Sequence, residues 1–314
     1  MPSPDNSPVD GGELRVHVTQ RPPAPRLAYV DQLVGAPGVR FRYSQRRIRR
    51  FDVDVIHVTD DQLDILLGTH GRSDWCRLLM ALAFALAIRF RKVALVRTLL
   101  PSPEIRTSRA WLRGQRILDA ATDVFVTPDG QVATPDSSRT VVIPYSHFRE
   151  RFIGFPRAKQ STTGVLWATG AEHATEDIAR PSQRIDVAAI SDGALAHRIT
   201  AAELVVVPKI DTLADLQMVF VALSLDRPVL TQTHETLTSL AETIGPRWLF
   251  LSQEPITSRE VHAAITQTRE AKPEPPPDLD AHDPGLIRNL YGETYARATH
   301  RRRRPKEPPH GAPL

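Results

Sequence analysis

Two polar residues follow a short apolar run in the second half of the chain and form the first candidate site. Lys209 and Asp211 come after residues 204–208, Leu-Val-Val-Val-Pro, whose composition predicts a buried strand of a parallel sheet. Ligands of open α/β sheets bind at the carboxyl ends of strands, so a lysine there is placed to bind an anion. Asp215 lies in the first turn of the helix predicted over 213–225. The alternative is a solvated loop, with the Asp215 carboxylate simply favoured by the helix dipole.

Three further side chains stand at the ends of predicted elements. His57 and Thr98 are near the ends of the strands predicted at 52–58 and 93–98, and His147 lies in the segment between the two halves of the chain. An imidazole or hydroxyl at such a position contacts a ligand if it faces a cleft, and we expect His57 to face one if the sheet prediction holds. The alternatives are a capped or solvated strand-end histidine for His57, a buried hydrogen-bonded histidine for His147, and a threonine chosen only for its strand preference.

A cluster of arginines precedes the strand at 52–58. Six arginines lie between residues 40 and 50, and four of them form its densest part: Arg46, Arg47, Arg49 and Arg50. A solvated basic face is one interpretation. The other is a patch that binds an anionic membrane or a lipid phosphate, where each cation contributes about 1 kcal/mol. We expect no nucleic acid partner, because few aromatic residues accompany the arginines and no nucleic-acid motif is present.

Metal and cofactor sites are not expected. Asp52-x-Asp54 has the spacing of a metal-binding pair, but it begins a predicted strand instead of lying in a loop. The single cysteine, Cys76, excludes an internal disulfide and suits a reducing compartment. Residues 1–12 lack the pattern of a signal peptide, and the longest apolar run, 78–88, is shorter than the roughly 20 residues of a membrane span. The expected location is cytoplasmic, with peripheral contact at the inner face of the membrane.

The elements that would position these residues alternate between strand and helix. In the first half we expect strands at 14–18, 39–43, 52–58, 93–98, 124–127 and 141–143 and helices at 73–91 and 107–121. In the second half we expect strands at 165–168, 185–190, 204–208, 229–231 and 248–251 and helices at 191–202, 213–225, 235–244 and 258–270, with Ser258 as the N-cap of the last. The alternation predicts an α/β fold of two Rossmann-like domains with largely parallel sheets.

The length of 314 residues suits two such domains. We expect the first domain at 13–144 and the second at 145–271. A Pro- and Asp-rich linker and a final helix, at 286–299, would occupy 272–299. Residues 1–12 and the basic tail 300–314 are expected to be disordered.

Five segments, in order, resemble those of GT-B glycosyltransferases. They are Phe-Asp-Val-Asp-Val-Ile-His-Val at 51–58, Val-Arg-Thr at 96–98 with Pro-Ser-Pro-Glu at 101–104, Ile-Pro-Tyr-Ser-His-Phe-Arg-Glu-Arg-Phe at 143–152, Ala-Leu-Ser-Leu-Asp-Arg-Pro-Val at 222–229, and Gly-Pro-Arg-Trp at 245–248. More narrowly, the chain looks like the retaining, nucleotide-sugar-dependent enzymes of bacterial surface-polysaccharide synthesis. The resemblance implies two domains facing a cleft and a C-terminal helix that crosses back to the first domain.

The resemblance also assigns roles. The first domain would hold the acceptor, near His57 and Thr98, and the second the nucleotide-sugar donor, near His147, Gly170, Lys209, Asp211 and Asp215. The sequence departs from the pattern where the donor diphosphate should bind, because residues 168–176 contain two glutamates and no Arg or Lys. No pair of glutamates occupies the segment after Pro208, and Leu99-Leu100 stands where the family has His-Asn.

Three hypotheses follow. The first is a glycosyltransferase of the bacterial cell envelope that transfers a sugar from a nucleotide sugar to a glycan or glycolipid, without a metal or other cofactor. The second is a non-catalytic GT-B relative that acts as a partner or glycan-binding subunit of an active glycosyltransferase. The third is an unrelated two-domain α/β enzyme, such as an epimerase of the same fold.

Overall fold

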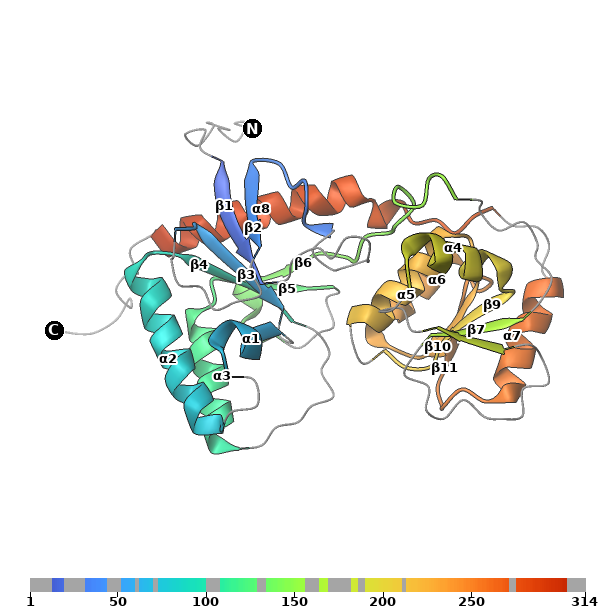
Figure 1. Cartoon of the computed structure of the whole chain (residues 1–314), viewed down its shortest axis with the longest axis horizontal. Helices are drawn as coiled ribbons and strands as arrows, with labels where there is room; N and C mark the ends of the chain where they lie inside the picture. Colours follow the sequence, from blue (N-terminus) through green and yellow to red (C-terminus); the bar gives the residue numbers. More distant parts are fainter. Residues whose placement is uncertain are drawn as a thin grey trace, which may run out of the picture.

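The structure is a computed structural model, and it contains two separate parallel sheets (Figure 1). It describes residues 13–19, 32–43, 52–59, 62–69, 73–99, 108–128, 134–155, 164–168, 182–185, 190–210, 213–270 and 275–303. The strands of the first sheet lie within residues 14–142 and those of the second within residues 165–252. The predicted α/β class with Rossmann-like parallel sheets is confirmed.

The first sheet has six strands in the order β2-β1-β3-β4-β5-β6, and every described pairing is parallel. The strands are β1 (Leu14–Val18), β2 (Val39–Tyr43), β3 (Val55–Thr59), β4 (Ala94–Thr98), β5 (Val124–Thr127) and β6 (Thr140–Val142). All five residues of β3 and of β4 are buried. Burial on both faces explains why their sequences are apolar throughout and do not alternate.

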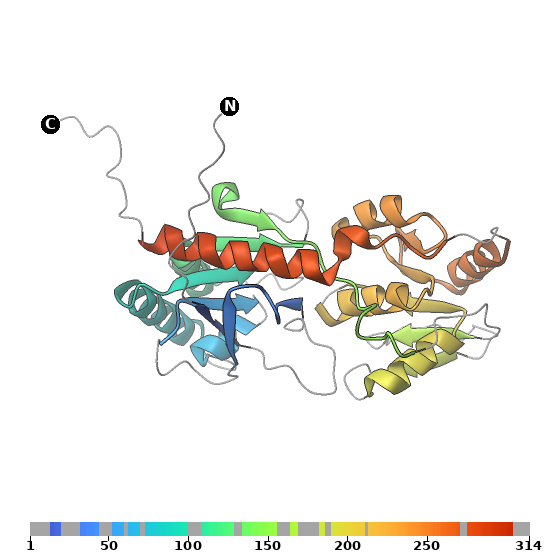
Figure 2. The ribbon, with the colours of Figure 1, turned by 90° about the horizontal axis from the view of Figure 1, so that it is seen from above.

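Helices cover both faces of this sheet. On one face α1 (Leu63–Leu67), α2 (Asp74–Phe90) and α3 (Arg109–Ala121) form a core with Ile56, Val58 and Leu95. Serines begin the two longer helices, since Ser73 and Ser108 accept hydrogen bonds from backbone N–H groups three residues on. On the other face lies α8 (Pro284–Arg303), which runs lengthwise along the sheet (Figure 2).

The second sheet has five strands in the order β11-β10-β9-β7-β8. They are β7 (Val165–Ala168), β8 (Ser182–Ile185), β9 (Leu204–Val207), β10 (Val229–Gln232) and β11 (Leu249–Ser252), all parallel in their described pairings. One face packs on α4 (Asp192–Ala201), α5 (Leu213–Ser224) and α6 (Glu235–Ile244), and the other on α7 (Ser258–Glu270). Each sheet is therefore sandwiched between helices.

The chain crosses between the sheets twice, through two segments that we call the first and second passages, and hydrogen bonds join these two segments. Residues 143–155 lead from the first sheet to the second, and residues 275–283 lead back to α8 (Figure 2). The His147 N–H donates to the His282 carbonyl at 2.8 Å, and the His282 imidazole lies 2.6 Å from the Tyr145 carbonyl. The Tyr145 ring stacks on Phe220 of α5 at 5.2 Å. As a result one continuous apolar core runs from the α8 face of the first sheet into the second.

Several predicted boundaries are wrong. Of the strand predicted at 185–190, residues 186–189 lie outside the described part of the chain. The described strand covers Ser182–Ile185 and so begins earlier than predicted; it pairs with β7 at the edge of the sheet and does not need an apolar sequence. Helix α7 has Thr257 as its N-cap, not Ser258. The Thr257 hydroxyl accepts from the Glu260 N–H while the Glu260 carboxylate accepts from the Thr257 N–H, which is a capping box.

The last helix is longer than predicted at both ends. It begins at Pro284 after Asp283, whose carboxylate accepts from the Leu286 N–H at 3.0 Å. It continues to Arg303, so residues 300–303 are helical and the expectation of a disordered tail from 300 is wrong there. The Arg302 guanidinium pairs with Asp123 at 2.6 Å. Residues 1–12 and 304–314 lie outside the described part of the chain.

No helix within the described residues is both long and apolar enough to cross a membrane.

Candidate functional site

Each sheet has a topological switch point, which is the place between two neighbouring strands where the order in which strands are added to the sheet reverses direction. In the first sheet it lies between β1 and β3, and in the second between β7 and β9. Neighbouring connections leave such strands on opposite sides, which opens a crevice at their carboxyl ends where ligands bind. Lys209 follows β9 by two residues and is exposed beside the second switch point. The position predicted for Lys209 is therefore confirmed, while its contact with a donor stays a prediction.

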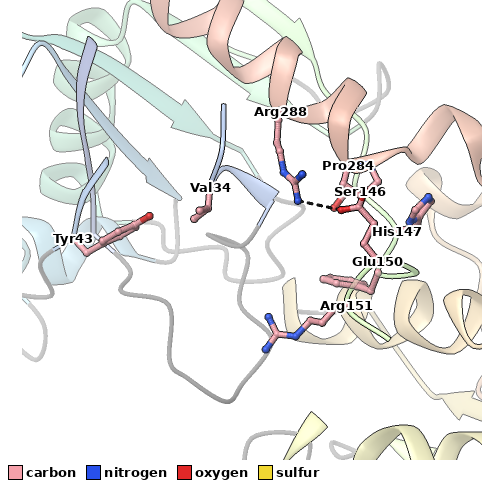
Figure 3. A pocket seen from close by; sticks show the side chains of 9 residues that line it. Val34, Tyr43, Ser146, His147, Glu150, Arg151, Pro284 and Arg288 are labelled. Atoms are coloured by element: carbon pink, nitrogen blue, oxygen red, sulfur yellow. Dashed lines mark ion pairs between the residues drawn. The ribbon is translucent and has the colours of Figure 1, made fainter. Parts of the chain in front are cut away.

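A cavity of about 440 Å³ lies at the carboxyl end of β2, the edge strand next to β1 (Figure 3). Its lining comes from three parts of the chain: Val34 and Tyr43, which precede and end β2; Ser146, His147, Phe148, Glu150 and Arg151 of the first passage; and Pro284 and Arg288 of α8. Tyr43 pairs in register with Val18 at the end of β1. In Figure 3, Val34 and Tyr43 face the residues of the passage across the cavity. A volume of this size is typical of small-ligand sites.

Two guanidinium groups supply positive charge to this cavity. Arg288 forms an ion pair with Glu150, its Nη2 lying 3.5 Å from the carboxylate, and Arg151 pairs with Asp192 at the start of α4 at 2.6 Å. The Arg288 Nε is buried, and the described residues offer it no hydrogen-bond partner. A guanidinium has five N–H donors, so Arg288 keeps the buried Nε–H beyond its ion pair.

The backbone turns at Gly35, next to the side chain of Arg288. Gly35 has φ +89°, and a Cβ at this position would lie 3.5 Å from the Arg288 Cδ. The positive φ, which side chains disfavour, turns the chain beneath the arginine stem. A short turn before β2 thus lies against the side chain of an arginine that comes from the far end of the sequence.

Hydrogen bonds fix the passage residues that line the cavity. The Ser146 N–H donates to Gln32 Oε1 at 3.0 Å, and the Phe148 N–H donates to the Ser224 hydroxyl at 2.8 Å. His147 is 8% exposed, and its Nδ1 accepts from the Arg149 N–H at 3.3 Å. Burial, with the nearby Arg149 charge, lowers the pKa of His147, so the imidazole is neutral at neutral pH. Its nearness to a ligand cavity agrees with the predicted donor role, which stays a prediction.

His57 and Thr98 lie in the interior, not at an open cleft. The His57 Nε2 is 2.8 Å from the Thr98 hydroxyl and its Nδ1 is 2.8 Å from the Tyr295 hydroxyl of α8. Exposure is 1% for His57 and 3% for Thr98, and burial lowers the pKa of His57 to about 3. The expectation that His57 faces the cleft is wrong, because its side of β3 is the side that α8 covers. A role for either residue in acceptor binding stays a prediction that needs α8 to move.

The remaining predicted residues are placed as follows. Asp215 is half-buried in the first turn of α5, as predicted. Gly170, Asp211 and the arginines at 46, 47, 49 and 50 lie outside the described residues. The structure therefore brings His147 to the cavity, keeps Lys209 and Asp215 at the second sheet, and separates both groups from the buried His57–Thr98 pair.

Sequence reasoning missed Tyr43, Arg151 and Arg288. Arg151 stands in the segment 143–152 that carried the resemblance, so its charge beside His147 was a usable signal. The sequence around Arg288 gave no such signal, because the direction of the Arg288 side chain depends on how α8 is rotated against the sheet. Together the two arginines and the cavity form a place where an anionic group such as a phosphate can be bound by charge-assisted hydrogen bonds.

No model of a known protein family matches the chain. Two curated relatives do, and both are named GDP-mannose:glycolipid 4-beta-D-mannosyltransferase. One, from a strain of Xanthomonas campestris pv. campestris, is 33% identical over 148 residues, or 47% of this chain and 40% of the relative. The other, also from Xanthomonas campestris pv. campestris, is 33% identical over 112 residues, or 36% of this chain and 32% of the relative. The matches span less than half the length of either relative, and they favour a glycosyltransferase.

Proposed function

We propose that this protein is a glycosyltransferase that transfers a sugar from a nucleotide sugar, with GDP-mannose as the first donor to test, to a glycolipid acceptor. The observation that carries the proposal is the coincidence of two independent features. One is the similarity to two GDP-mannose:glycolipid mannosyltransferases, and the other is the cavity that Arg151 and Arg288 line where residues 146–151 meet the start of α8. In the reaction the acceptor hydroxyl oxygen would bond to the sugar C1, while the bond from C1 to the phosphate oxygen breaks and its electron pair leaves with the nucleoside diphosphate. The hydroxyl proton would pass to the leaving phosphate or to water.

The chain's own residues would act by holding charge. The leaving diphosphate carries the negative charge that develops during transfer, and fixed cations at that place lower the barrier. In this proposal Arg288 and Arg151 bind the phosphates, with Lys209 and His147 as further contacts, and no metal is required. The GT-B arrangement, with an acceptor-side domain at 13–144 and a donor-side domain at 145–271, is part of the proposal. The return of α8 to the first sheet supports it.

Calorimetric titration of the full chain with GDP, GDP-mannose, UDP and UDP-glucose tests donor binding. We expect micromolar binding of the guanosine compounds, and an at least tenfold weaker affinity in the Arg288→Gln variant. The matched control is Arg259→Gln, an exposed arginine of α7 on the other side of the second sheet. Absence of binding to the whole panel, or equal binding by the two variants, contradicts the proposed site.

Transfer itself is tested with radiolabelled GDP-mannose and a panel of lipid-linked oligosaccharides. The anomeric configuration of the new glycosidic bond shows whether transfer proceeds with retention or with inversion. Retention, expected from the resemblance, would give an α-mannoside from an α-linked donor, whereas the β-linkage in the relatives' name would mean inversion.

A second candidate is the non-catalytic relative that partners an active glycosyltransferase. The observation that favours it is the absence of Arg and Lys from residues 168–176, together with the carboxylates Glu150 and Asp192 that already pair with the cavity arginines. Binding of GDP or of a glycan without transfer to any acceptor would select this candidate.

A further inference from the structure

Helix α2 is apolar on two opposite sides, and the described residues cover only one of them. Its inner side packs on the first sheet through Ala81, Phe84 and Ile88. Its outer side carries a row of large exposed side chains, which we call the α2 apolar stripe: Trp75, Leu79, Leu82, Leu86 and Phe90. Trp75 is 64% exposed and Phe90 83%. Such residues normally lie inside a protein or at a contact, so this side of α2 requires a partner.

The spacing of the α2 apolar stripe is regular. Its steps of four, three, four and four residues place the five side chains within an arc of about 80° at 100° per residue, along about 22 Å of helix. The sequence 78–88 contains no charged residue at all. A stripe of this length and width has the form of a helix face that lies in the plane of a membrane interface.

The adjacent helix supplies positive charge to the same surface. Helices α2 and α3 pack closely, with a Cβ on Gly114 of α3 lying 3.5 Å from the Leu78 Cα of α2. The outer side of α3 carries the α3 arginine stripe, defined as Arg109, Arg113 and Arg116, all exposed at steps of four and three residues. Arg89, Arg91 and Lys92 are exposed at the C-terminal end of α2. Both helices cover the same face of the sheet and lie side by side (Figure 1), so the stripes on their outer sides belong to one surface of the protein.

The charge of this surface identifies the kind of partner. The acidic residues of α2 and α3 are Asp74 and Asp119, and Asp119 is bound to Arg97. A second copy of the chain would bring the same cations and few carboxylates to match them. An anionic lipid bilayer offers both a negative surface for the arginines and an apolar interior for the Trp, Leu and Phe side chains.

We propose that the outer face of α2 and α3 docks the protein on an anionic membrane, with the α2 apolar stripe inserted at the headgroup boundary and the α3 arginine stripe bound to lipid phosphates. This proposal does not use the arginines at 46–50, which lie outside the described part of the chain. It does not depend on the proposed function, because docking needs no sugar donor. If both proposals hold, α2 brings the first sheet to the surface where a glycolipid acceptor resides.

Vesicle flotation of the full chain tests the docking. We expect binding to vesicles of 30% phosphatidylglycerol in phosphatidylcholine, weaker binding at high salt, and little binding to phosphatidylcholine alone. Leu79→Gln with Leu86→Gln should weaken binding at least tenfold. The matched control is Ile153→Gln, which removes an apolar side chain that is 86% exposed elsewhere.

Charge is tested by a second pair of variants. Arg113→Gln with Arg116→Gln should weaken binding by about 30-fold, from about 1 kcal/mol for each cation at an anionic surface. Arg198→Gln with Arg259→Gln changes the net charge equally, on exposed positions of α4 and α7, and should bind as the wild type does. Equal binding by the two double variants would overturn the assignment of the arginines.

Insertion has its own readout in Trp75. Brominated lipids quench tryptophans that enter the acyl region, so they should quench the wild type and not the Trp75→Phe variant. The proposal fails if the wild type does not float with anionic vesicles or if Trp75 is not quenched. It also fails if sedimentation shows instead a dimer that Leu79→Gln with Leu86→Gln dissociates, because the stripe would then be an interface between proteins.

Discussion

The buried His57 should make the stability of this protein depend on pH between 7.5 and 5.5. Its pKa is held at about 3 by burial, whereas in the unfolded chain it returns to 6.5. Below pH 6.5 the His57 imidazole is therefore protonated in the unfolded state but stays neutral in the folded state. As a result the free energy of unfolding falls as the pH falls towards 3. At pH 7.5 this loss is close to zero.

The magnitude follows from the two pKa values. Between pH 7.5 and pH 5.5, His57 alone should lower the free energy of unfolding by about 1.4 kcal/mol. His17, whose pKa is lowered to about 4 by burial, adds a loss of about the same size. The carboxylates Asp54 and Asp136, whose pKa values are lowered, titrate below this range and contribute little to it.

The His57→Gln variant isolates the contribution of His57. Glutamine does not titrate, so the loss of stability from pH 7.5 to 5.5 should be smaller than in the wild type by about 1.4 kcal/mol. At pH 7.5 the variant should be less stable than the wild type by about 1–3 kcal/mol, because partners of the imidazole are left without it, and this deficit should shrink by about 1.4 kcal/mol at pH 5.5. Urea unfolding at the two pH values measures both effects, and His197→Gln, on the exposed side of α4, is the matched control.

A second measurement is independent of the unfolding mechanism. In a carbon–proton correlation spectrum of the imidazoles, the His57 signal is identified as the one that is missing from the His57→Gln variant. This signal should not shift between pH 8 and pH 5. The reasoning is refuted if that signal titrates near pH 6.5, or if the variant loses as much stability on acidification as the wild type does.

Two further predictions concern stability. Asp119→Ala should lower the free energy of unfolding by about 3 kcal/mol, since it removes a carboxylate 2.6 Å from the fully buried Arg97 guanidinium; a loss under 1 kcal/mol in urea unfolding would show that this pair is not required. Thr257→Ala should cost about 1 kcal/mol by removing the capping box of α7, and Thr257→Ser should restore most of that loss in the same measurement. If the alanine and serine variants are equally stable, the cap contributes nothing.

Periodic segments could be predicted from the sequence and edge segments could not. The strands β5 and β7 and the helices α6 and α7 lie at the predicted residues, because each has the full apolar pattern of a buried element. The edge strand β8 has a polar sequence, Ser-Gln-Arg-Ile, and only its pairing with β7 defines it. The end of α8 was missed because its four last residues are polar and are held by groups of the first sheet, such as Asp123.

The candidate site was predicted only where it depends on local sequence. Lys209 follows from the position of β9, which its apolar run already showed. His57 was assigned to the wrong surroundings, since a strand has two faces and the sequence does not say which one a distant helix will cover. Arg288 reaches the cavity because Tyr291 and Tyr295 fix the rotation of α8 against the sheet, which is a tertiary effect.

The path of α8 has a consequence for synthesis on the ribosome. The face of the first sheet that carries Val16, Val55 and Val96 is covered by a helix made more than 140 residues after β6. During translation this face stays bare while the whole second sheet emerges, so the nascent first half holds an uncovered apolar surface for several seconds at ordinary elongation rates. We expect such a chain to bind chaperones until residues 284–303 leave the exit tunnel, and the first half to reach its final stability last.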